Sequence, residues 1–153
     1  MSEASQSQSV DVEASVSVCV SVLLDFPHYP TWSGPIQSCR VLEVDAAGRG
    51  RIVEFVLDMK IRSVRYVLEY AYDLHPGDQP GSATWSLVEG DVAAVDGSYR
   101  FEPLGKKRSR ATCSQSVDVG FWIPGPLRRI FERQALRDSV LEFKAEAERR
   151  AKE

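Results

Sequence analysis

The residue best suited by type to acid–base chemistry is His28, because the pKa of a histidine is ordinarily about 6.5. It stands between two prolines in the segment FPHYPTW, residues 26–32. A catalytic histidine needs an acid partner that orients its ring, and no such partner is evident beside His28 in the sequence. We therefore interpret His28 as an exposed corner residue, with a catalytic acid or base as the alternative.

The two prolines give this segment a structural reading. Pro27 and Pro30 are expected to end a preceding helix, and each favours extended backbone at the residue before it. The segment is therefore expected to form a corner that closes one edge of a sheet. Trp32, at the end of the segment, is expected to pack inward.

The other reactive side chains do not assemble an obvious site. Cys19, Cys39 and Cys113 are too far apart for a zinc signature, and their odd number argues against a disulfide framework, so we expect reduced core cysteines. Glu89 and Asp91 could pair their carboxylates, but they flank a glycine and are expected to shape a turn. We expect no metal ion and no cofactor, and the sequence assigns no catalytic residue.

Length and composition indicate one globular domain. The chain has 153 residues, of which 43% are hydrophobic and 27% charged, and its net charge of −3 argues against a nucleic-acid partner. It has no apolar run long enough for a bilayer, and its polar start MSEASQSQS does not resemble a secretory signal. We expect a soluble cytoplasmic protein, with a flexible N-terminus over residues 1–8 and a single domain over residues 9–153.

One basic segment, KKRSR at residues 106–110, departs from the acidic balance. We interpret it as the solvated tip of a hairpin. The alternative is transient contact of this segment, together with Arg128 and Arg129, with an anionic membrane surface, while Phe121 and Trp122 insert and gate a binding site. The sequence leaves open whether the protein is a monomer or a homodimer.

The elements that must position these residues begin with a sheet. Segments rich in β-branched and aromatic residues alternate with turn signals, and VRYVLEYAY has an apolar residue at every second position from Val64 to Tyr72. We expect strands near residues 36–45, 51–59, 62–73, 83–89, 92–102 and 109–119. Their short connections require antiparallel pairing. The Asp-Gly pair at residues 96–97 predicts a bulge or a break inside its strand.

A long helix is expected to follow the sheet. Pro126 suits a first helical position, and no later Gly or Pro occurs, so the helix should have about 25 residues, near 125–150. Its apolar residues fall on two sides, so it either bends or is buried on both. One side holds Leu136, Val140, Phe143 and Ala147, and the other holds Leu127, Ile130, Phe131 and Ala135. Gln134 and Asp138 lie on the second side, as polar groups that could face an interior.

The N-terminal region is ambiguous by periodicity. Valine or alanine occupies every second position from Val10 to Val22, which alone predicts a strand of about 15 residues, much longer than usual. A break at residues 14–17 resolves this, with a strand before it and a short helix, capped by a serine, after it.

The order of these elements and five segments resemble the polyketide cyclase/dehydrase group of the START-like (SRPBCC) superfamily. The segments are DFPHYPTW, RYVLEY, SLVEGD, GSYRFEPLG and FWIPGPLRRIFERQAL. The resemblance implies an α+β helix-grip fold, in which a curved antiparallel sheet of about seven strands wraps around the long C-terminal helix. It also implies two short helices after the first strand and a cavity between the sheet and the C-terminal helix.

Alternation along the strands then predicts which side chains face that cavity. Most are large and apolar, with a few hydroxyl or amide groups, which suits an apolar ligand. The candidate ligand-binding residues are Trp32, Phe55, Leu57, Tyr66, Leu68, Tyr70, Trp85, Tyr99, Gln115, Phe121, Phe131, Gln134 and Asp138.

Three functions remain open. The first is binding or transport of a hydrophobic small molecule, such as a lipid, a quinone or a polyketide-like compound. The second is a polyketide cyclase, aromatase or dehydratase acting in the same cavity, with Arg40 or Arg51 as further polar groups if they point inward. The third is a protein-interaction module similar to the coenzyme Q-associated or toxin-like branches of the superfamily.

Overall fold

The computed structural model describes residues 6–60, 62–120 and 125–153, and between 125 and 131 it describes the side chain of Arg128 alone. A seven-stranded sheet has the order β1-β7-β6-β5-β4-β3-β2, and every neighbouring pair is antiparallel. Its strands are β1 (Gln6–Val12), β2 (Ile36–Val44), β3 (Gly50–Asp58), β4 (Ser63–Asp73), β5 (Gly81–Gly90), β6 (Ala94–Gly105) and β7 (Arg108–Asp118). The helices are α1 (Val16–Leu24), η1 (Phe26–His28), α2 (Tyr29–Trp32) and α3 (Gly125–Ala151).

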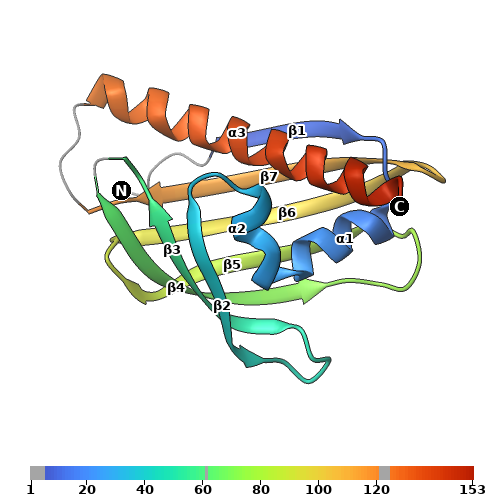
Figure 1. Cartoon of the computed structure of the whole chain (residues 1–153), viewed down its shortest axis with the longest axis horizontal. Coiled ribbons are helices and arrows are strands. Elements are labelled where there is room, and N and C mark those ends of the chain that lie inside the picture. Colours follow the sequence, from blue (N-terminus) through green and yellow to red (C-terminus); the bar gives the residue numbers. More distant parts are fainter. Residues whose placement is uncertain (1–5, 61, 121–124) are drawn as a thin grey trace.

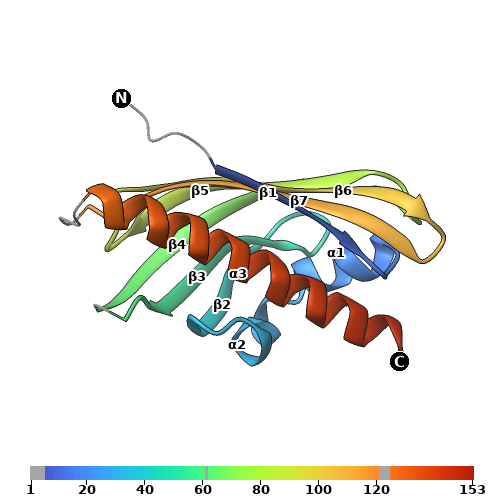
Figure 2. The same ribbon diagram turned by 90° about the horizontal axis from the view of Figure 1, so that it is seen from above.

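All the helices lie on one side of the curved sheet. In Figure 1, α3 crosses the face of the sheet along its length, and Figure 2 shows α1 and α2 on the same side. The expected strands are all present, the largest difference being the end of β6, at Gly105 instead of residue 102. The predicted helix-grip architecture is therefore confirmed.

The break in the N-terminal alternation is also confirmed. Ser15 caps α1, because its side chain accepts a hydrogen bond from the backbone N–H of Val18. Helical periodicity then buries Val16, Cys19 and Val22 together in the core. The strand before the break begins at Gln6, which lies inside the segment 1–8 that was expected to be flexible.

The proline-rich corner differs from its prediction. Residues 26–32 are helical instead of extended, as η1 followed directly by α2, and Tyr29, the residue before Pro30, has φ −51° and ψ −42°. Each proline stands in the first turn of its helix, where the missing N–H would have no helical partner. The prolines therefore start two short helices.

The prediction of a bulge or break in the strand at residues 96–97 is wrong. β6 pairs in continuous register with both neighbours through Asp96 and Gly97. The glycine is needed for packing, because a Cβ atom added to Gly97 would lie 2.4 Å from the indole ring of Trp85. Gly97 thus marks a close approach of a large side chain.

Of the two apolar sides expected on α3, one is buried. Its residues are Leu136, Val140, Phe143 and Ala147. On the other side Ala135 is exposed, and the side chains of Leu127, Ile130 and Phe131 lie outside the described residues. No helix in the described part of the chain is long and apolar enough to span a membrane.

Candidate functional site

Aromatic side chains from the strands and helices form one connected cluster on the concave face of the sheet. Phe26 stands at its centre, with its ring centroid 5.0 Å from that of Tyr70 and 5.2 Å from that of Tyr29. From α3, Phe143 stacks on Tyr99 with a centroid distance of 4.8 Å. The rings that touch one another are Phe26, Tyr29, Trp32, Phe55, Tyr66, Tyr70, Tyr72, Trp85, Tyr99, Phe101 and Phe143.

The hydroxyl groups of this cluster have different roles. Tyr29 donates its hydroxyl to the carbonyl oxygen of Leu23, and Tyr72 donates to the carbonyl oxygen of Gly50 at 2.5 Å. These two phenols hold the helices and strands in place. Tyr99 has no such partner among the described residues.

Burial controls the protonation of the inward tyrosines. It raises the pKa of Tyr66, Tyr70 and Tyr99 above the ordinary value of 10.0, and neighbouring thiols and phenols add to the effect. Their hydroxyls are therefore neutral hydrogen-bond donors at physiological pH. Part of the Tyr66 side chain is exposed, yet the apolar surroundings of its hydroxyl still raise the pKa.

Several inward residues are only partly buried near one end of the sheet, which we call the open end, although Val64 and Val95 at that end are 1% and 2% exposed. There β3, β5 and β7 end, and β2, β4 and β6 begin. Phe101 and Ala111, at the far end, are 1% and 0% exposed. The partly exposed inward residues at the open end are Leu57, Met59, Tyr66, Leu87, Gln115 and Val117.

Three buried polar atoms have no hydrogen-bond partner in the described part of the chain. They are Nε1 of Trp32, the hydroxyl of Tyr99 and Oε1 of Glu142. An unsatisfied buried polar group ordinarily costs about 1–3 kcal/mol of stability, so each of these atoms is a candidate partner for a further polar group.

Most of the predicted ligand-binding residues lie on this concave face. Trp32, Phe55, Leu68, Tyr70, Trp85 and Tyr99 belong to the core, while Leu57, Tyr66 and Gln115 lie at the open end. Gln115 also accepts a hydrogen bond from Nε1 of Trp85, at 3.3 Å. Phe121 and the side chain of Phe131 lie outside the described residues.

The prediction for Gln134 and Asp138 is wrong. Both are exposed, and Nε2 of Gln134 donates to Oδ1 of Asp138 at 2.9 Å on the outer surface of α3. On α3 the polar atom that is buried without a partner is Oε1 of Glu142, a residue that sequence reasoning missed. It directly precedes the buried Phe143, and Glu146 follows one turn later with 8% exposure, so acidic residues flanking the apolar stripe were the available signal.

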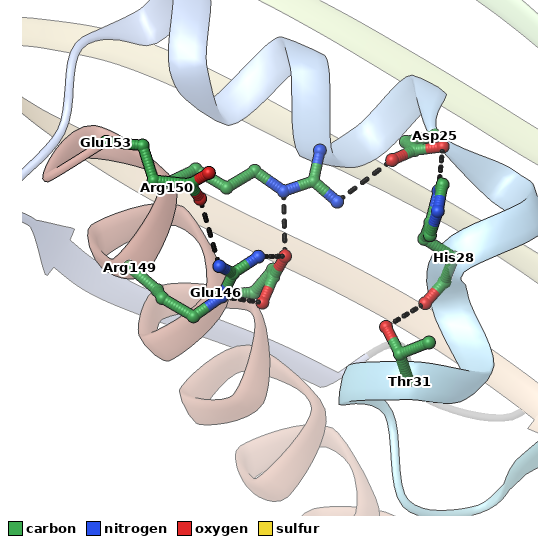
Figure 3. A pocket seen from close by; sticks show the side chains of 7 residues that line it. All are labelled: Asp25, His28, Thr31, Glu146, Arg149, Arg150 and Glu153. Carbon is green, nitrogen blue, oxygen red and sulfur yellow. Dashed lines mark hydrogen bonds and ion pairs between the residues drawn. The ribbon is translucent and has the colours of Figure 1, made fainter.

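A polar pocket of about 360 Å³ lies between the corner and the end of α3 (Figure 3). The reason for treating His28 as unpartnered does not hold, because its Nδ1 lies 2.8 Å from Oδ1 of Asp25, three residues earlier. The other carboxylate oxygen of Asp25 pairs with Arg150 at 3.0 Å. The hydroxyl of Thr31 donates to the carbonyl oxygen of His28, so it is already engaged.

Charges in this polar pocket neutralise one another. Glu146 pairs with Arg149 and Arg150, and these hydrogen bonds, chiefly that of Arg149, lower the pKa of Glu146 to about 2 despite its burial. The pocket therefore ties the end of α3 to α1 and η1, and it offers a ligand no unpaired charge among these residues.

Another hollow, of about 420 Å³, lies on the outer face of the sheet over β4, β5 and β6. Exposed polar residues line it, including Glu69, Thr84, Ser86 and Asp96. Trp85 borders this hollow beside Gly97, which has no side chain to separate them. The hollow therefore lies behind the aromatic cluster.

Two arginines of the basic segment are engaged in ion pairs. Arg108 and Arg110 both pair with Asp11 of β1, at 3.1 and 2.9 Å, and Arg108 also pairs with Glu13. Both arginines lie at the start of β7, whereas Asp118 lies at the other end of this strand. Phe121 and Trp122, which complete the predicted membrane-contacting surface, lie outside the described residues.

The remaining charged candidates are structural. Arg40 pairs with Glu54, and Arg51 pairs with Glu43 and Glu69, so neither arginine serves the interior. In the turn after β5, Oδ2 of Asp91 accepts the backbone N–H of Arg65 at 2.9 Å, and Glu89 pairs with the guanidinium of Arg65. Glu89 and Asp91 shape this turn, as expected.

The three cysteines are free, as expected. Cys19 and Cys113 are buried, and Cys39 is partly buried. Burial raises the pKa of Cys39 and of Cys113 to about 12, so these thiols stay protonated and unreactive at neutral pH.

The sheet, the gripped helix and the aromatic interior define a START-like helix-grip protein. Over residues 12–144 the chain matches the model of the family described as "Polyketide cyclase / dehydrase and lipid transport". The chain belongs to this family, whose hydrophobic substrates agree with the apolar interior described above. No curated protein sequence matches the chain.

Similar solved structures support the fold. A START superfamily protein from Mycobacterium smegmatis is 21% identical, with a TM-score of 0.84 over 95% of this chain and 97% of the other. The Zhui aromatase/cyclase from a Streptomyces species is 20% identical, with a TM-score of 0.76 over 96% and 94%. A STAR-related lipid transfer protein from Xanthomonas axonopodis is 11% identical, with a TM-score of 0.77 over 94% and 85%.

Proposed function

We propose that the protein binds a hydrophobic small molecule, a lipid or a polyketide-like compound, between the concave face of the sheet and α3. The observation that carries this proposal is the exposure of inward apolar side chains at the open end, where Leu57, Leu87 and Val117 are only partly covered. Apolar residues that face the interior of a fold are ordinarily covered, and a hydrophobic ligand would cover them.

Apolar burial is sufficient for useful affinity. A ligand that buries about 500 Å² of apolar surface gains about 12 kcal/mol at about 25 cal/mol per Å². If association costs about 4 kcal/mol, about 8 kcal/mol remains, which corresponds to micromolar affinity. The aromatic rings would supply most of this contact, and the neutral tyrosine hydroxyls would orient the ligand.

A cyclase or dehydratase acting at the same place is the second candidate. It is favoured by the buried Oε1 of Glu142, which has no partner among the described residues, because a carboxylate oxygen can act as a general base. The similarity to an aromatase/cyclase agrees with this candidate, as the similarity to a lipid transfer protein agrees with the first.

The test is a titration with the neutral probe N-phenyl-1-naphthylamine, followed by its fluorescence. We expect saturable binding of one probe per chain, with a dissociation constant in the micromolar range. Leu87→Gln should weaken binding several-fold, because it places an amide on the apolar inward face.

Leu104→Gln is the matched control. Leu104 lies near the opposite end of the sheet with 40% exposure, so the same substitution there should leave binding unchanged. The absence of saturable binding would refute the proposal and favour the protein-interaction module. Equal losses in both variants would place the probe elsewhere.

A further inference from the structure

The three unpartnered polar atoms come from three different elements that meet at one residue. Trp32 belongs to α2, Tyr99 to β6 and Glu142 to α3. The ring of Phe143, next to Glu142, packs edge-on against Trp32 at 6.0 Å and stacks on Tyr99. Phe143 thus contacts Trp32 and Tyr99 and directly follows Glu142 in the sequence.

A hydrogen bond fixes the carboxylate of Glu142 toward α2. Its Oε2 accepts the backbone N–H of Gly34 at 3.0 Å, two residues after Trp32. The other oxygen, Oε1, is buried and has no partner among the described residues. The side chain is therefore held at one oxygen, and the second oxygen is buried without a donor.

Glu142 forms no ion pair within the described part of the chain, unlike Glu146, which has two arginine partners. Its buried Oε1 can accept a hydrogen bond but has no donor among the described residues. An anionic ligand headgroup would have no hydrogen to donate to Oε1.

Trp32 and Tyr99 impose the complementary requirement. The indole N–H can only donate, and the buried hydroxyl of Tyr99 is a neutral donor at physiological pH. A group that donates to Glu142 and accepts from Trp32 or Tyr99 satisfies this arrangement. A single hydroxyl does so, because it has one hydrogen and two acceptor lone pairs, whereas a carboxylate or a ketone has no hydrogen to donate.

Building on the proposed function, we infer that the ligand is a hydrophobic molecule with a neutral hydroxyl group, an alcohol or a phenol, and that Glu142 selects it over a carboxylate. The aromatic cluster contacts the hydrophobic part of the ligand, and the polar atoms around Phe143 form hydrogen bonds with its hydroxyl group. Fatty acids and other anionic amphiphiles are therefore poor ligands.

The experiment compares 2-naphthol with 2-naphthoate, which share one ring system, as competitors of N-phenyl-1-naphthylamine at pH 7.5. We expect 2-naphthol to displace the probe at least tenfold more effectively than 2-naphthoate. In Glu142→Gln, which keeps the size and an acceptor for Gly34, this preference should shrink several-fold while the affinity for the probe stays unchanged.

Asp138→Asn is the matched control, because it removes the same charge from the same helix at an exposed position. The inference is overturned if 2-naphthoate competes as well as 2-naphthol, or if Asp138→Asn changes the preference as much as Glu142→Gln. Saturable binding of the probe without a preference for the hydroxyl rejects this inference alone. Loss of probe binding in the wild type rejects the proposed function as well.

Discussion

Tyr72 and Tyr99 illustrate how the same phenol serves different purposes in one core. Tyr72 donates to the carbonyl oxygen of Gly50 and so joins β4 to β3, whereas Tyr99 is 6% exposed and has no partner among the described residues. In the ligand-free protein the first hydroxyl stabilises the fold and the second destabilises it.

Phenylalanine substitutions should separate these two roles. Tyr72→Phe should lower the free energy of unfolding by about 1 kcal/mol, because it leaves the carbonyl oxygen of Gly50 without its donor. Tyr99→Phe should leave it unchanged or raise it by up to about 1 kcal/mol, because an unsatisfied hydroxyl is removed at nearly constant shape. Urea denaturation measures both. A larger loss in Tyr99→Phe than in Tyr72→Phe would show that the Tyr99 hydroxyl has a partner.

At the scale of strands, packing against a neighbouring ring decides where glycine is needed. Gly97→Ala should destabilise the protein by about 1–3 kcal/mol, because the new Cβ would lie 2.4 Å from the Trp85 indole in a packed interior. Gly105→Ala is the control, since nothing lies within 4 Å of a Cβ at that position. Thermal unfolding of the two variants should differ clearly. Equal melting temperatures would show that Trp85 moves aside without cost.

At the scale of the last helix, adjacent residues provide a sharper comparison. Val140→Asp should prevent folding, because Val140 is 1% exposed and an unpaired charge would be buried against the sheet. Leu141→Asp should be nearly neutral, since Leu141 is 46% exposed. Circular dichroism of the two proteins tests the orientation of α3. A folded Val140→Asp variant would contradict it.

Periodicity explains which parts of these elements could be predicted from the sequence. Strands have a period of two, so alternation gave the inward positions Phe55, Tyr70 and Trp85 correctly. On α3 two apolar sets competed, and the polar residues Gln134 and Asp138 were assigned to an interior although they lie outside. The helical period alone shows which residues share a face of the helix, but it does not show which face packs against the sheet.

Contacts between distant segments could not be predicted in the same way. The ion pairs of Arg108 and Arg110 with Asp11 exist because β1 pairs with β7, across most of the chain. The contact between His28 and Asp25 depends on the helical backbone of the corner. The two prolines had predicted extended backbone there, so this contact was not expected. The burial of Oε1 of Glu142 depends on tertiary packing around α3, so no local sequence pattern predicts it.

For the whole molecule, the two ends of the sheet have different chemistry. At the open end several inward residues, most of them apolar, are partly exposed, as a ligand entrance requires. At the opposite end α3 is tied to the corner by Asp25, Arg150 and Glu146. Stability concentrated at the tied end allows the open end to admit a ligand without unfolding the domain.

The tied end should make stability depend on acid. The folded pKa of Glu146, about 2, lies below its ordinary value of 4.5, so the native state holds the ionised form more tightly than the unfolded chain does. The stabilisation is fully present above the unfolded pKa and is lost as pH falls through about 4.5 toward 2. Glu146→Gln should lower the free energy of unfolding at pH 7 by about 1.5–3 kcal/mol, because the three hydrogen bonds that Arg149 and Arg150 donate to Glu146 lose their charged acceptor. Its loss of stability between pH 5 and pH 2, followed by urea denaturation, should be smaller than that of the wild type.

Glu153→Gln, at the exposed end of the same network, should change neither quantity. If the wild type and Glu146→Gln lost stability in parallel over this pH range, the acid dependence would belong to other carboxylates.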